Sequence, residues 1–371
     1  MKKVLCIFAS CLLLACSSEE ENGGEIVIEG ILPEDVIVCN EGGMGSDNGS
    51  LSRISAVDGT VTNNWFRITN NVKLGDTPCS TLQINDTLIA ISVTGSNIIR
   101  FINIDGVACG ATEAVPKSRR MCTDGQFLYV TSYAHQCGNQ SFTKGFVAKI
   151  DLRTMSVIGT CEVGWEPDGI ALYDGRLYIA NTGGYSFSED HDYESTIDVV
   201  RASNMTKITT IETGKKNLFG DIAQTGKYLL INASGDYITS GPATILLDCS
   251  TNTFTTFDFP GTYSDAYDGK FYVLGFEFSY ETYAYVFSLH TIDVKTQSVT
   301  DGIYSQEVTD AITSMDAPYS MHISPETGFL YITDANDYQG AGTLYVFDNQ
   351  GHAKRNVSVG ICPSHIITLK R

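Results

Sequence analysis

The stretch that decides the fold runs from Ala317 to Gly360 and reads APYSMHISPETGFLYITDANDYQGAGTLYVFDNQGHAKRNVSVG. It contains four short runs rich in β-branched and aromatic residues, and Gly, Asn, Asp or Pro bounds each run. Runs of this kind predict four antiparallel strands, which we name A, B, C and D. The unit is about 45 residues long, and repeats of that length are typical of propeller blades and other solenoids.

The same unit recurs earlier in the chain, with decreasing similarity. Further copies begin at Thr77, Arg120, Glu166, Gly220 and Ser264. Each copy offers an apolar run at the B position, bounded by turn residues, as a buried strand requires. Together with the stretch from Ala317 to Gly360, these copies predict six complete blades.

The two ends of the repeat region complement each other. After Gly360 the chain supplies one more A strand, Cys362–Leu369, and then stops. The N-terminal part lacks an A strand but supplies B at Asp35–Asn40, C at Ser50–Ile54 and D at Val61–Phe66. One C-terminal strand and three N-terminal strands would complete a seventh blade and close a ring, which leaves only short sheet edges. We therefore predict an all-β fold, a seven-bladed β-propeller of four-stranded blades closed by a split blade.

A disulfide could link the two ends of the chain covalently within this split blade. Cys39 ends the predicted B strand of the split blade, and Cys362 begins its A strand. Neighbouring antiparallel residues can have the separation that a disulfide needs, so we predict a bond between Cys39 and Cys362. The alternative is that both remain reduced and buried.

The N-terminus reads as an export signal. Met1-Lys2-Lys3 is basic, and residues 4–15 form a mostly apolar run that is too short to span a bilayer. It ends Leu-Leu-Ala before Cys16, which resembles a bacterial lipobox whose cysteine is lipidated. An ordinary secretory signal is the alternative. We predict a signal peptide over residues 1–15, a lipidated Cys16 with a tether to residue 33, and the propeller over residues 34–371.

Charge and cysteine content narrow the functional classes. The formal net charge of −19 and the near absence of basic clusters argue against binding of nucleic acid or of anionic lipid, so membrane contact is expected through the lipid anchor only. Of 11 cysteines, Cys6 and Cys11 leave with the signal, and no CxxC pair remains in the body. Zinc-ribbon and thioredoxin-like readings therefore find no support.

The strand order predicts one decorated face. Connections from B to C and from D to A share a face, and they include long loops such as 182–195, 275–285 and 335–342. Long loops on one side of a rigid scaffold usually bind ligands. Rigid aromatic side chains with one polar end suit a large, partly apolar ligand. The candidate ligand-binding residues, which could instead pack between blades, are Tyr133, Trp165, Tyr185, Phe187, Tyr237, Phe276, Tyr319, Asp334 and Tyr338.

Signals for catalysis are weak. GxSxG, HExxH and a GxGxxG in a βαβ context are absent from the sequence. Oxygen-bearing residues at the ends of B strands could converge on the ring axis and hold calcium. They are Glu41, Asn181, Asn232 and Asp334. Asn and Asp also end strands because they accept turn geometry, so we expect no enzyme and no resident cofactor, with a calcium-dependent hydrolase or lyase as the alternative.

Several stretches resemble a known family. Residues 38–42 (Val-Cys-Asn-Glu-Gly), 330–342 and 359–363 (Val-Gly-Ile-Cys-Pro) are similar to YncE-like propellers and, more closely, to the surface propeller lipoproteins of Bacteroidetes that include the BtuG-type cobalamin-binding proteins. The acidic run after Cys16 resembles the surface-export signal of such lipoproteins.

The resemblance implies a function. It implies a protein anchored in the outer membrane, facing outward, that captures vitamin B12 or another corrinoid and passes it to a TonB-dependent transporter. A glycan-binding or protein-binding accessory lipoprotein with the same aromatic face is the alternative.

Overall fold

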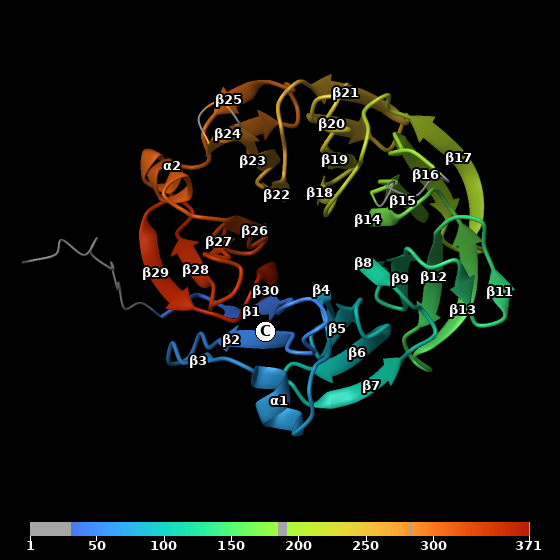
Figure 1. Ribbon diagram of the computed structural model, residues 1–371, viewed down its shortest axis with the longest axis horizontal. Coiled ribbons are helices and arrows are strands. Elements are labelled where there is room, and N and C mark those ends of the chain that lie inside the picture. The colour runs from blue at the N-terminus through green and yellow to red at the C-terminus, as the bar shows by residue number, and fades with distance from the viewer. Residues whose placement is uncertain (1–30, 185–190, 280, 282, 371) are drawn as a thin grey trace, which may run out of the picture.

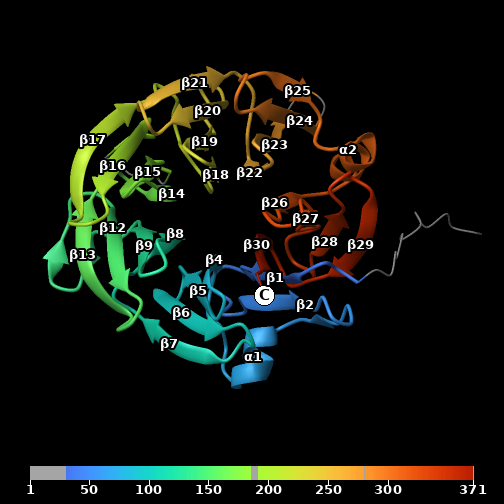
Figure 2. The same cartoon turned by 180° about the vertical axis from the view of Figure 1, so that it is seen from behind.

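The chain forms a closed ring of seven four-stranded antiparallel sheets (Figures 1 and 2). The computed structural model describes residues 31–184, 191–279, 281 and 283–370. The predicted all-β, seven-bladed propeller is confirmed. The predicted lipidation site Cys16 and the candidate residues Tyr185 and Phe187 lie outside the described residues.

We number the blades along the chain. Blade 1 contains β4 (Pro78–Asn85), β5 (Leu88–Val93), β6 (Ile98–Asn103) and β7 (Ala108–Thr112). Blade 2 contains β8 (Ser118–Thr123), β9 (Phe127–Ser132), β12 (Phe146–Asp151) and β13 (Ser156–Glu162). Blade 3 contains β14 (Pro167–Tyr173), β15 (Arg176–Asn181), β16 (Thr196–Arg201) and β17 (Thr206–Glu212).

The second half of the ring repeats this order. Blade 4 contains β18 (Ala223–Thr225), β19 (Tyr228–Ala233), β20 (Ala243–Asp248) and β21 (Thr253–Phe257). Blade 5 contains β22 (Tyr263–Tyr267), β23 (Lys270–Ser279), β24 (Ala284–Asp293) and β25 (Val299–Asp301). Blade 6 contains β26 (Pro318–Ile323), β27 (Leu330–Asp334), β28 (Thr343–Phe347) and β29 (Ala353–Ser358).

The closing blade joins the two ends of the chain, as predicted. Its sheet order is β3-β2-β1-β30, with β1 at Asp35–Asn40, β2 at Ser50–Ile54, β3 at Val61–Thr62 and β30 at Pro363–Leu369. Glu34 adds a contact between the closing blade and blade 6, because its buried carboxylate accepts hydrogen bonds from Thr327 Oγ1 (3.0 Å) and Tyr331 OH (3.4 Å).

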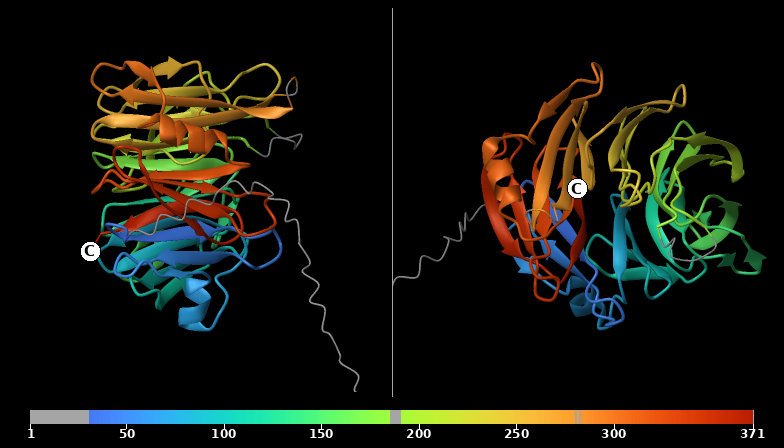
Figure 3. Two further views of the ribbon diagram at one scale, coloured as in Figure 1. Left: turned by 90° about the vertical axis from the view of Figure 1, so that its left-hand side faces the viewer. Right: turned by 45° about the horizontal axis from the view of Figure 1, so that its top comes forward.

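The core lies between neighbouring sheets. Every residue of the B strands β1 and β27 is buried, because these strands face another blade on both sides. The outermost strand of blade 3, β17, is by contrast exposed at all but one of its residues. This gradient explains why the B strands read as continuous apolar runs in the sequence. The left view of Figure 3 shows the ring from the side.

Three elements depart from the predicted repeat. The strand expected at Val61–Phe66 ends at Thr62, and α1 (Trp65–Asn70) follows it. Consecutive residues of a strand point to opposite faces, whereas Trp65 and Phe66 both bury into the core under the closing blade. The helix α2 (Gln306–Thr313) and the short hairpin of β10 (Gln136–Cys137) and β11 (Gln140–Ser141) are also insertions that the repeat did not predict.

Two further points correct the predictions. The segment 275–285 is not a loop, because β23 and β24 extend through most of it as a long hairpin. The disulfide between Cys39 and Cys362 is not formed, and both are free thiols. Cys39 pairs with His365 across the ladder and faces the core, while the Cys362 thiol donates to the carbonyl of Tyr338 at 3.6 Å.

Neither helix of the described residues is long and apolar enough to cross a membrane.

Candidate functional site

A cavity lies on the ring axis, where the A strands of neighbouring blades meet. Its volume is about 270 Å³, and β4, β8, β22, β26 and β30 line it together with the segment that leads into β18. Each A strand follows a D-to-A connection, so the first residues of these strands lie at the decorated face. The charged and titratable groups in its wall are Arg120, Asp221, Asp265, His322 and His365.

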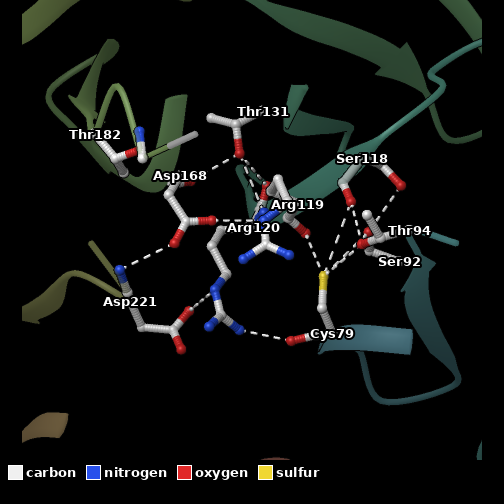
Figure 4. A network of polar contacts seen from close by, with 12 residues as sticks. Cys79, Ser92, Thr94, Ser118, Arg119, Arg120, Thr131, Asp168, Thr182 and Asp221 are labelled. Carbon is white, nitrogen blue, oxygen red and sulfur yellow. Dashed lines mark hydrogen bonds and ion pairs between the residues drawn. The ribbon is translucent and has the colours of Figure 1, made fainter. Parts of the chain in front are cut away.

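Two arginines at the start of β8 are held by carboxylates from the next blades (Figure 4). Arg119 Nε donates to Asp168 Oδ1 at 2.8 Å, and Asp168 is fully buried. Arg120 Nε lies 3.2 Å from Asp221 Oδ1, and its Nη1 donates to the carbonyl of Cys79 at 2.6 Å. These contacts join blades 1, 2, 3 and 4 around the axis.

Electrostatics stabilise the buried pair in its charged form. Burial by itself would raise the pKa of Asp168, but the guanidinium groups of Arg119 and Arg120 outweigh it and hold that pKa below its usual value. Burial likewise would lower the pKa of Arg119, and the carboxylate of Asp168 overcomes it. The backbone N–H of Gly220 adds a hydrogen bond to Asp168 Oδ2 at 3.0 Å. A carboxylate removed from water needs such partners to remain ionised.

Two histidines, His322 and His365, also line the cavity. His365 Nδ1 contacts Thr81 Oγ1 at 3.0 Å, and its Nε2 lies 3.8 Å from Asp221 Oδ2. Burial lowers the pKa of His365 to about 4, although Asp221 opposes the shift. His365 is therefore neutral at pH 7. His322 Nδ1 contacts Asp265 Oδ2 at 2.9 Å.

Three hydroxyl side chains and the thiol of Cys79 lie beside the two arginines (Figure 4). Ser92 Oγ donates to Ser118 Oγ at 2.8 Å, and Thr94 Oγ1 lies 2.6 Å from the carbonyl oxygen of Ser118. The thiol of Cys79 lies within 4 Å of these groups. This network joins blades 1 and 2 and has a structural role.

An aromatic cluster stands at the mouth of the cavity on the decorated face. It contains Tyr263, Phe276, Tyr285, Tyr319 and Tyr338, and we name it the rim cluster. The Phe276 ring centroid is 6.3 Å from that of Tyr263 and 5.3 Å from that of Tyr285. The rings of Tyr319 and Tyr338 meet edge to face at 5.7 Å. The cluster thus draws on blades 5 and 6 and reaches the closing blade.

The rim cluster is partly exposed and carries polar ends. Tyr338 and Tyr285 are 46% and 37% exposed, which leaves ring surface available to a ligand. Tyr319 OH donates to Glu41 Oε2 of the closing blade at 2.9 Å. Burial and the interaction with Tyr285 raise the pKa of Tyr338 to about 12, so its hydroxyl stays protonated at neutral pH.

The other candidate aromatic residues are dispersed. Trp165 stacks on His191 with ring centroids 4.1 Å apart, and Glu166 contacts that histidine at 2.8 Å. Tyr237 packs against Tyr193 at 6.1 Å. Tyr133 stacks on the guanidinium of Arg119 at 4.9 Å. Of the candidate residues within the described part of the chain, the structure brings Phe276, Tyr319 and Tyr338 into one cluster.

Each of the four residues suggested for calcium already has hydrogen-bond partners. Asn181 Nδ2 donates to Thr196 and Asp198 within blade 3, and Asn232 Nδ2 donates to Ser264. Buried Asp334 accepts from the backbone N–H groups of residues 316, 317 and 336. The fourth, Glu41, contacts Tyr319 as described above. Among the described residues no group of three or more His, Cys, Asp or Glu could hold a metal ion.

The sequence analysis missed the polar wall of the cavity and two members of the rim cluster. Arg120, Asp221 and His365 were not among the candidate residues. A signal existed: each of them falls near the start of an A strand, at equivalent places in different repeats. Tyr285 was missed because 275–285 was read as a loop rather than as alternating strand residues.

Comparisons with known proteins agree with the architecture. No family model and no curated protein matches the chain by sequence. Solved structures do match: a quinoprotein alcohol dehydrogenase-like protein from Bacteroides thetaiotaomicron has a TM-score of 0.60 at 12% identity, covering 91% of this chain and 78% of that one. A Kuenenia stuttgartiensis hydrazine synthase has a TM-score of 0.57 at 15% identity, covering 76% and 85%.

AztD from Citrobacter koseri also matches, with a TM-score of 0.50 at 13% identity, covering 89% of this chain and 88% of that one. The neighbours include seven-bladed propeller proteins. At this level of identity the likeness concerns the fold alone. The chain is a seven-bladed β-propeller.

Proposed function

We propose that this propeller is a surface-anchored lipoprotein that captures vitamin B12 or another corrinoid on its decorated face. The observation that carries the proposal is the rim cluster, a partly exposed group of aromatic side chains at the mouth of the axial cavity. The resemblance of residues 38–42, 330–342 and 359–363 to corrinoid-binding surface propellers supplies the ligand class.

The chemistry of the cluster suits such a ligand. A corrin is a broad macrocycle with apolar edges and amide side chains. Aromatic rings supply large contact areas at little cost in side-chain entropy, and tyrosine hydroxyls offer hydrogen bonds to amides. Because Tyr319 is held by Glu41 and Tyr338 packs against Tyr319, both rings are ordered before a ligand arrives. Order of this kind reduces the entropic cost of binding.

Delivery to a TonB-dependent outer-membrane transporter is the second part of the proposal. The support lies in the sequence: the lipobox-like Leu-Leu-Ala-Cys16, the acidic run after it, and the stretch up to residue 33, which would serve as a tether. We propose that the transporter contacts the decorated face once the ligand is bound.

Two other functions remain as rivals. A glycan could also stack on the rim cluster, so a glycan-binding accessory protein is the second candidate. A calcium-dependent hydrolase or lyase is less well supported, because Asn181, Asn232 and Asp334 already serve hydrogen bonds within or next to their own blades.

Isothermal titration of the mature protein with cyanocobalamin tests the proposal. We expect saturable one-to-one binding, and we expect Phe276→Ala and Tyr338→Ala each to weaken it by about tenfold or more, as truncation of a central aromatic contact does. Tyr237→Ala is the matched control, because Tyr237 is 75% exposed but contacts Tyr193 rather than the rim cluster. Absence of heat with cyanocobalamin, together with binding on a glycan array, would select the second candidate.

A further inference from the structure

We propose that the axial cavity is a second binding site, for a small organic cation such as a quaternary or protonated amine. This inference is independent of the corrinoid, since it concerns the space below the rim cluster. It rests on the size of the cavity, the sign of its accessible charge, and the side chains of its wall.

The cavity fits a small molecule and not a macrocycle. Its volume of about 270 Å³ lies just below the range of about 300–1,000 Å³ that is usual for sites of drug-sized ligands. A corrin would therefore rest on the rim cluster, outside this space. An amine with a few carbon atoms could enter it whole.

The charge that the cavity presents is negative. The side chain of Asp221 is 46% exposed and that of Asp265 is 25% exposed, whereas that of Arg120 is 11% exposed and its guanidinium is engaged by Asp221 and by the carbonyl of Cys79. His365 is neutral at pH 7, since burial lowers its pKa to about 4. His322 Nδ1 contacts Asp265 Oδ2 at 2.9 Å. Asp221 is paired with Arg120, and Asp265 also accepts from the backbone N–H of Ile323 at 2.8 Å. The wall therefore carries two carboxylates against one guanidinium, and the carboxylates are the more exposed of these groups.

The remaining wall suits an alkylammonium group. Tyr263 and Phe219 place aromatic rings along the cavity, and ring faces attract cations. Ser364 also lines the cavity, and its side chain is buried. The net charge of −19 would further raise the local concentration of cations.

The experiment is a titration with choline, compared with its neutral carbon isostere 3,3-dimethyl-1-butanol. The two probes have the same shape and differ in charge, so the comparison isolates the electrostatic part. We expect choline to bind with a Kd of about 1 mM or tighter, and the isostere to bind about tenfold more weakly or not at all. Equal affinity for both probes, or no binding of choline, would overturn the proposal.

Variants locate the site. Asp221→Asn keeps the shape of the side chain and removes its charge, and we expect it to weaken choline binding about tenfold. The control is Asp258→Asn, which removes an exposed carboxylate that is paired with Lys215 and does not line the cavity, and which should leave the affinity unchanged. An Asp221→Asn variant that binds choline as well as the parent protein overturns the assignment. Should that variant fail to fold, the comparison of choline with its isostere on the parent protein still decides.

Discussion

Burial of His365 within the ring makes the stability of the fold depend on pH. Its ring lies between Thr81 and Asp221, and its pKa is about 4 in the folded protein against an ordinary value of 6.5. Between these two values the unfolded chain holds a proton that the folded chain does not. The free energy of unfolding must therefore fall as the pH falls from about 6.5 to about 4.

We predict that His365→Gln removes this part of the pH dependence. In the parent protein it should amount to about 1.4 kcal/mol per pH unit across the window, and the variant should lose stability less steeply there. Urea unfolding at several pH values measures it. His352→Gln serves as the control, since His352 is a surface residue. Parallel curves for the parent protein and His365→Gln would contradict the account.

At the same scale, residue type alone did not reveal the site. The rim residues Phe276, Tyr319 and Tyr338 could be predicted because the strand order of the repeat assigns their positions to the decorated face. Arg120 and Asp221 could not, because nothing in their local sequence tells that β8 and the segment before β18 meet at one cavity. Charged residues on an inner strand become informative only when the repeats are aligned with one another.

Among the elements, the hairpin of β23 and β24 departs most from the repeat. Its last pairing with β22 is at Leu274, and its first with β25 is at His290. Between these points the two strands continue their ladder with each other as far as Ser279 and Ala284. The hairpin therefore extends beyond the blade and carries Phe276 and Tyr285 to the rim cluster. Phe276 and Phe287 still pack against the core, whereas Tyr285 and Val286 are exposed.

We predict that shortening this hairpin separates folding from binding. Replacing residues 278–285 with Asn-Gly leaves positions 277 and 286, which pair in the parent protein, to flank a two-residue turn. The midpoint of thermal unfolding should stay within a few degrees, because the removed residues pair only with one another, while cyanocobalamin affinity should fall by about tenfold or more. The single change Tyr283→Ala, at the exposed tip, should alter neither.

Unchanged affinity in the shortened protein would show that the hairpin is not part of the site.

The hairpin also marks the limit of what could be predicted from the sequence. B strands such as β15 and β27 were recognisable because burial on both faces demands a continuous apolar run. The helices α1 and α2 interrupt the repeat, and tertiary burial of Trp65 and Phe66 decides α1 where local propensity does not.

For the whole molecule, ring closure depends on hydrogen bonds and packing. The predicted disulfide between Cys39 and Cys362 is absent, and β30 instead pairs with β1 along its length. Buried Glu34 then joins the first residues of the ring to Thr327 and Tyr331 of blade 6. Burial and this carboxylate raise the pKa of Tyr331, which keeps its hydroxyl protonated as a donor.

We predict that Glu34→Ala destabilises the propeller by about 1–3 kcal/mol, because it leaves the buried hydroxyl of Tyr331 without its partner. Urea unfolding provides the value. Glu113→Ala, at an exposed position, should change the free energy of unfolding by less than about 0.5 kcal/mol. Equal effects of the two substitutions would mean that Glu34 plays no part in closure.

The most direct test of the central claim is hydroxyl-radical footprinting of the mature protein with and without cyanocobalamin. The method reports which aromatic side chains a ligand shields from solvent. The account predicts protection of Phe276, Tyr285 and Tyr338, with Trp165 and Tyr237 unchanged. Protection of Trp165 and Tyr237 in place of the rim cluster, or identical footprints with saturating ligand, would contradict it.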